Sequence, residues 1–91
     1  MGETEYTEKI MRVLEIYDEL KNGKLINKEK MAVRYQVSPR TIQRDIEDLR
    51  NYFSNIRARN GEDREVLYDH TRHGFRLVQY IPDEDETVST K

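Results

Sequence analysis

The sequence predicts a small α+β domain in which three helices are followed by a β-hairpin, and three observations support this fold class. Apolar residues recur at helical spacing in three stretches of the first 53 residues. Strand-like alternation follows between residues 65 and 79, on both sides of a turn that ends at Gly74. The chain has 91 residues and no cysteine, so it holds one core without a disulfide or a cysteine-ligated zinc site.

The first predicted helix runs from Tyr6 or Thr7 to about Asn22, after a flexible N-terminus of residues 1–5. Gly23 can adopt positive φ at the C-terminal cap. The inward face is expected to consist of apolar side chains, with Ile16 widening it: Tyr6, Ile10, Val13, Leu14, Tyr17 and Leu20. The sequence shows no further apolar stripe that would serve as a dimerisation seam.

The second predicted helix is short and runs from Lys28 to about Tyr35, capped by Asn27. Met31 and Ala32 are its main apolar contacts, and the small alanine allows a close approach of the next helix. Residues 36–37 form a tight turn after it. Two helices joined in this way make a helix-turn-helix.

The third predicted helix begins with Ser38 as N-cap and Pro39 at the first helical position, where a missing N–H costs nothing. Its apolar stripe is expected to dock into the core and consists of Ile42, Ile46, Leu49 and Phe53. The helix is expected to end between Phe53 and Asn55. Residues 56–63 are ambiguous, either a short strand or a linker, with a strong turn pair at Asn60-Gly61.

The opposite face of this helix carries side chains that can hydrogen-bond: Arg40, Thr41, Gln43, Arg44, Glu47 and Asp48. Arginine can donate bidentately to guanine, and glutamine can read adenine, so the pattern predicts a recognition helix over 39–53 in a DNA major groove. The plainer alternative is that Arg44 only pairs with Asp48 on a solvated face. Asp45 is expected to be architectural, anchoring Arg34 or a backbone N–H.

The predicted hairpin of residues 65–79 turns at His70 to Gly74. Its expected inward residues are Val66, Tyr68, Phe75 and Leu77. Residues 81–91 form an acidic tail that is expected to be disordered.

Two segments carry a resemblance to a known family. Val37-Ser38-Pro39-Arg40-Thr41-Ile42-Gln43-Arg44-Asp45-Ile46 and Tyr68-Asp69-His70-Thr71-Arg72-His73-Gly74-Phe75-Arg76-Leu77 resemble the recognition helix and wing of DeoR-like and WYL-domain bacterial transcription regulators. The resemblance implies a winged helix-turn-helix DNA-binding domain over residues 6–80 of a cytoplasmic protein. It also implies a homodimer in the full-length protein and an effector-sensing C-terminal domain that this chain lacks. Gln36 departs from the pattern, which usually has glycine there.

The net charge of −2 conceals an uneven distribution. Residues 21–59 carry ten basic against four acidic side chains, a net charge of +6. Basic charge concentrated around a helix-turn-helix favours contact with phosphates.

The predicted DNA-binding residues lie on all three parts of this motif: Ser38, Arg40, Thr41, Gln43, Arg44, Lys28, Arg72 and His73. The last two are at the wing tip, where they would meet a minor groove or a phosphate. Lys28 could instead be an ordinary solubilising lysine, and the wing could merely close the core.

The chain shows no pattern of an enzyme, a cofactor site or a metal site. The two histidines, His70 and His73, have no spaced set of carboxylates around them. No apolar run approaches the roughly 18 residues of a membrane span. Two further interpretations stay open: a winged helix that binds another protein without reading DNA sequence, and the regulatory fragment of an enzyme.

Overall fold

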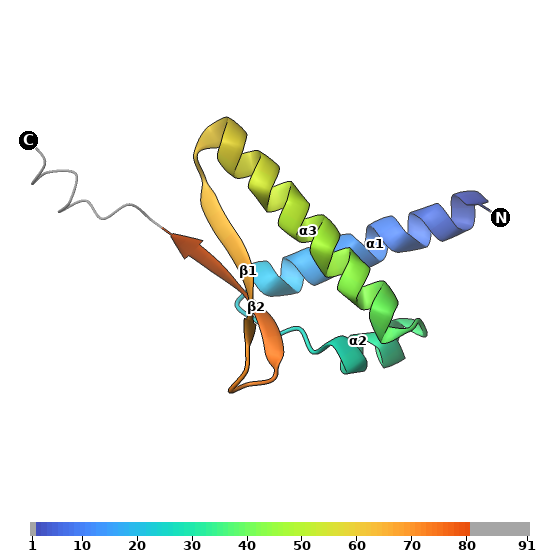
Figure 1. The fold of residues 1–91 in the computed structure, drawn as a ribbon. Helices are drawn as coiled ribbons and strands as arrows, with labels where there is room; N and C mark the ends of the chain where they lie inside the picture. The colour runs from blue at the N-terminus through green and yellow to red at the C-terminus, as the bar shows by residue number, and fades with distance from the viewer. Residues whose placement is uncertain (1, 81–91) are drawn as a thin grey trace, which may run out of the picture.

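The computed structural model describes residues 2–80, which form three helices followed by a two-stranded antiparallel sheet (Figure 1). The elements are α1 (Gly2–Lys21), α2 (Lys28–Tyr35), α3 (Pro39–Asn60), β1 (Asp63–Asp69) and β2 (Gly74–Tyr80). This arrangement confirms the predicted α+β fold of the winged helix kind. The acidic tail predicted for residues 81–91 lies outside the described residues.

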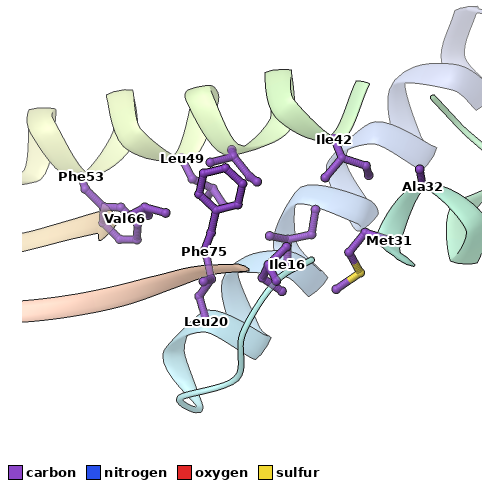
Figure 2. Close-up of a cluster of buried hydrophobic side chains, with 11 residues drawn as sticks. Ile16, Leu20, Met31, Ala32, Ile42, Leu49, Phe53, Val66 and Phe75 are labelled. Atoms are coloured by element: carbon purple, nitrogen blue, oxygen red, sulfur yellow. The ribbon is translucent and has the colours of Figure 1, made fainter. Parts of the chain in front are cut away.

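One core joins all five elements (Figure 2). Its buried side chains are Ile16, Leu20, Ile26, Met31, Ala32, Ile42, Ile46, Leu49, Phe53, Val66 and Phe75. The stripe predicted for α3 is confirmed, since its four apolar residues are all at most 5% exposed. Because this face is buried, the opposite face of α3 is free for function.

Helix α1 differs from the prediction in its start and in its inward face. It begins at Gly2 rather than at Tyr6 or Thr7. Ile16 and Leu20 are buried, whereas Ile10 is 41% and Leu14 is 58% exposed. At 100° per residue, Ile10 and Leu14 lie about 120° and 160° around the helix from Ile16. Figure 1 shows the N-terminal half of α1 extending past the other elements, and the buried residues of α1 accordingly lie in its C-terminal half.

The ends of the short helix α2 are fixed by local hydrogen bonds. The Asn27 side chain accepts from the Lys30 N–H at 2.9 Å, which confirms the predicted N-cap. At the other end Gln36 adopts the left-handed conformation, with φ 56° and ψ 45°. A side chain with a Cβ is strained there, and this explains why the related pattern favours glycine.

We therefore expect Gln36→Gly to stabilise the domain by about 1 kcal/mol, because glycine adopts positive φ without a steric penalty. For a domain of this size, that corresponds to a rise of roughly 4–8 °C in the melting temperature. Thermal unfolding followed by circular dichroism measures the change. Gly23, which already has φ 84°, offers the converse control, since Gly23→Gln should lower the melting temperature. An unchanged or lower melting temperature for Gln36→Gly would contradict the strained turn.

Helix α3 is longer than predicted. Ser38 caps its start, as expected, but the helix continues to Asn60. It ends where Gly61, at φ 76°, donates its N–H to the Arg57 carbonyl at 2.9 Å. Residues 56–60 are therefore helical, neither a strand nor a linker, because no glycine or proline interrupts the helix before Gly61.

The hairpin is paired from Asp63↔Tyr80 to Asp69↔Gly74, slightly longer than the predicted 65–79. Val66 and Phe75 point into the core and Leu77 packs against it, as predicted. Tyr68 does not, since it is 40% exposed and lies against the Phe75 ring at the edge of the core. Ile26 adds a bridge to Phe75 through two backbone hydrogen bonds of 2.9 and 2.8 Å. This bridge fixes the sheet against the segment that leads into α2.

Candidate nucleic-acid interface

The predicted site residues lie on three neighbouring parts of the fold. In Figure 1 the N-terminal end of α3, helix α2 and the β1–β2 turn all lie toward the lower edge of the molecule. The residues at these positions are Ser38, Arg40, Thr41, Gln43 and Arg44 on α3, Lys28 on α2, and Arg72 and His73 in the turn.

Arg40 and Arg44 are exposed on the first two turns of α3. Neither guanidinium forms an ion pair or a hydrogen bond with another residue of the described part of the chain, residues 2–80. The alternative pairing of Arg44 with Asp48 is not formed, and Asp48 binds Lys9 of α1 at 2.8 Å instead. Both arginines are thus available to an outside acceptor.

The neighbouring side chains on this face are tied to one another. Gln43 Nε2 donates to Glu47 Oε2 at 2.8 Å, and Arg50 Nη1 lies 3.2 Å from the same oxygen. Glu47 therefore holds Gln43 and is partly neutralised by Arg50. To read a base, the Gln43 amide would exchange Glu47 for that base.

The first turn of α3 is closed by two hydroxyls. Ser38 Oγ accepts from the Thr41 N–H at 3.2 Å, and the two hydroxyl oxygens are 3.1 Å apart. Ser38 is thus occupied as the N-cap, and Thr41 is half-buried with its hydroxyl next to that of Ser38.

The orientation of α3 is fixed by a charge network that the sequence did not reveal. Asp45 is fully buried, and its carboxylate accepts hydrogen bonds from the Arg12 guanidinium, including one from Nη2 at 3.3 Å. Lys9 Nζ lies 3.6 Å from the same carboxylate. Hydrogen bonding to Asp45 raises the pKa of Arg12 above its ordinary value. The network ties α1 to the buried side of the candidate recognition helix.

The prediction that Asp45 anchors Arg34 or a backbone N–H was therefore wrong. Arg34 binds Glu19 of α1 at 2.6 Å instead, and Asp45 binds Arg12. Asp45 and Arg12 are 33 residues apart, and no local spacing signals such a contact.

The β1–β2 turn is held by one acidic side chain. Asp69 Oδ1 accepts the N–H groups of Thr71 and Arg72, both at 3.0 Å. The Asp69 carbonyl also accepts from the His73 N–H at 2.8 Å, and His73 has φ 60°. Arg72 and His73 are exposed on this ordered turn.

A second contact joins this turn to the helix-turn-helix. Asn27 Nδ2 donates to the His73 carbonyl at 3.1 Å, while Asn27 Oδ1 caps α2. A hollow of about 200 Å³ lies between α2 and the turn, with Lys30, Arg34 and Arg72 among its lining residues. One side chain thus sets the spacing between the start of α2 and the wing tip.

The hydrogen bonds that Asp69 accepts predict how the stability of the β1–β2 turn depends on pH. The pKa of Asp69 is lowered from its ordinary value of 3.8, first by the backbone hydrogen bond from Arg72. Its stabilising effect on the turn is therefore fully present above 3.8 and is lost as the pH falls through the lowered pKa. Side-chain NMR should show Asp69 titrating below 3.8, with the Arg72 amide shift following it. In Asp69→Asn the Arg72 amide should not titrate, and a wild-type titration at or above the ordinary value would contradict the geometry.

None of the helices within residues 2–80 is long and apolar enough to cross a membrane. In the same part of the chain, no three or more His, Asp or Glu side chains gather where they would hold a metal ion.

The fold and the exposed face of α3 define a helix-turn-helix of the winged helix kind. The family described as "HTH domain" matches residues 12–62, more than half of the chain, and the chain therefore belongs to this family. The match covers the second half of α1, then α2, the turn and all of α3, and it ends just before β1. No curated protein and no solved structure matches the chain. Membership of the family indicates a DNA-binding domain of a transcription regulator.

Proposed function

We propose that this chain is a sequence-specific, double-stranded DNA-binding domain of a bacterial, cytoplasmic transcription regulator related to the DeoR-like and WYL-domain class. Helix α3 enters the major groove and the β1–β2 hairpin acts as the wing. The observation that carries the proposal is the exposed pair Arg40 and Arg44, without partners among residues 2–80, on a helix whose other face is locked into the core.

In this proposal most polar side chains at the start of α3 contact bases or phosphates, and one caps the helix. Arg40 and Arg44 reach base edges or phosphates, since the guanidinium fork fits guanine O6 and N7. Gln43 reads adenine after releasing Glu47, and Thr41 contacts a phosphate or a thymine methyl. Ser38 chiefly caps the helix.

The remaining contacts are to the DNA backbone. Lys28 stands at the N-terminus of α2, where the helix dipole favours a phosphate. Arg72 and His73 lie on the turn that Asn27 links to α2, so the wing grips the flanking backbone or minor groove.

The test is a selection of bound sequences from random duplex DNA. We expect the wild-type chain to enrich one motif and Arg40→Ala/Arg44→Ala to lose it. Arg57→Ala/Arg59→Ala is the matched control, because it removes the same charge from the far end of α3 and should keep the motif. If about five to seven phosphates are neutralised, log K should fall against log salt with a slope of about −4 to −6.

An absence of enrichment, with only weak and salt-sensitive binding, would overturn the proposal. The protein-binding interpretation of the winged helix would then take its place. Loss of the motif in both double variants would show that charge alone, rather than reading by the first turns of α3, governs binding.

A further inference from the structure

The hollow between α2 and the β1–β2 turn is lined by basic side chains from both elements. Lys30 of α2 lies on one side of it, and Arg72 and His73 of the turn lie on the other. Its volume of about 200 Å³ is below the roughly 300–1,000 Å³ of a pocket for a whole small-molecule ligand. A space of this size and charge fits a single anionic group such as a phosphate.

Two acidic side chains near this hollow are engaged by other groups. Glu19 lines the hollow, but its carboxylate binds Arg34 at 2.6 Å. Asp69, in β1 next to the turn, accepts backbone N–H groups of the turn and lies 3.4 Å from Arg76. The remaining positive charge of the hollow therefore has no carboxylate bound to it within residues 2–80.

The backbone around the hollow is held in place by hydrogen bonds inside the domain. The His73 carbonyl accepts from Asn27 at 3.1 Å, and the His73 N–H donates to the Asp69 carbonyl at 2.8 Å. Asn27 also accepts from the Lys30 N–H at 2.9 Å, so it links both sides of the hollow. An anion that enters meets side chains on fixed backbone, and little conformational entropy is lost when it binds.

We propose that the hollow holds one phosphate of the DNA backbone between Lys30, Arg72 and His73, and that DNA binding is coupled to protonation of His73. This coupling rests on the proposed DNA-binding function and adds a dependence on pH to it. Histidine is the side chain that changes charge between about pH 5 and 8, and a neighbouring phosphate favours the imidazolium form. The extra affinity is therefore fully present at low pH, where the imidazole of the free chain is already protonated. It is lost as the pH rises through the range in which the imidazole of the complex gives up its proton.

The first experiment measures the affinity of the chain for the selected duplex between about pH 6 and about pH 8 at constant salt, by fluorescence anisotropy. We expect the wild type to bind about five- to tenfold more weakly at the upper pH, since one proton changes affinity at most about tenfold per pH unit. His73→Asn should lose this dependence, and asparagine tolerates the left-handed backbone at this position, where φ is 60°. His70→Asn is the matched control, because His70 belongs to the same turn but packs on the Tyr68 ring and does not line the hollow. It should keep the dependence.

The second experiment tests the charges of the hollow directly. His73→Arg carries a permanent charge, so it should bind at about pH 8 as tightly as the wild type binds at about pH 6. Lys30→Ala should reduce the magnitude of the salt slope by about 1, as loss of one phosphate contact does. Lys21→Ala, at the exposed end of α1, is its control and should leave the slope unchanged. Circular dichroism checks that all variants remain folded.

Equally tight binding of the duplex at both ends of the pH range would overturn the coupling and leave the DNA-binding proposal intact. A pH dependence that His73→Asn retains, or that His70→Asn removes to the same extent, would overturn it as well. If the chain binds no duplex at any of these pH values, the DNA-binding proposal fails and the coupling fails with it.

Discussion

Replacing Arg44 by alanine is expected to weaken binding to the selected DNA motif by about 1–3 kcal/mol, roughly 5- to 150-fold, and to relax preference at one base pair. The guanidinium is exposed on the second turn of α3, and no described residue neutralises it. Its loss therefore removes a DNA contact without breaking an interaction inside the domain. Fluorescence anisotropy with the selected duplex and with single-base variants measures both effects.

Lys28→Ala is the informative comparison for this prediction. If Lys28 contacts a phosphate, binding weakens evenly across all duplexes and the salt slope falls by about 1 in magnitude. If it is only a solubilising lysine, neither quantity changes. An even weakening by Arg44→Ala, with base preference unchanged, would assign Arg44 to the phosphate backbone rather than to a base.

Local signals were sufficient for the elements that carry the candidate site. The Ser38 cap, Pro39 at the first helical position and the stripe from Ile42 to Phe53 depend on neighbouring residues, so the sequence alone predicted where α3 begins and which face it buries. The left-handed turn at Gln36 was indicated differently, by the resemblance, since the related pattern usually has glycine at that position. These features follow from backbone geometry within one or two turns.

Local signals could not predict which face of α1 is buried. The helix has apolar residues around much of its surface, and the packing of α3 and the Ile26 segment decides which of them become buried. Ile16 is buried in that packing, whereas Ile10 and Leu14 are 41% and 58% exposed. On a helix with apolar residues around much of its surface, periodicity alone does not separate the buried positions from the exposed ones.

Polar contacts between residues far apart in the chain could not be predicted from the sequence either. Asn27 could be predicted as a cap, but its second hydrogen bond reaches the carbonyl of His73, 46 residues away. The end of α3 failed for a different reason. The apolar stripe stops at Phe53, yet the helix needs only solvent and an unbroken backbone to continue to the Asn60-Gly61 stop.

We expect the largest loss of stability when Asp45, the buried carboxylate of the charge network, is replaced. Asp45→Ala should reduce the free energy of unfolding by about 3–5 kcal/mol, because it leaves the Arg12 guanidinium, 11% exposed, without its carboxylate. Small domains are stable by only about 5–15 kcal/mol, so this substitution removes a large fraction of the margin that keeps the chain folded. Urea unfolding at neutral pH measures the change.

The control for this substitution lies three residues further along α3. Asp48 also binds Lys9, but it is 50% exposed, so Asp48→Ala should cost no more than about 1 kcal/mol. The double variant Arg12→Leu/Asp45→Leu removes both charges and should be more stable than Asp45→Ala, since no unpaired buried charge remains. Equal losses for Asp45→Ala and Asp48→Ala would mean that apolar packing alone, without the Arg12–Asp45 pair, holds α1 against the recognition helix.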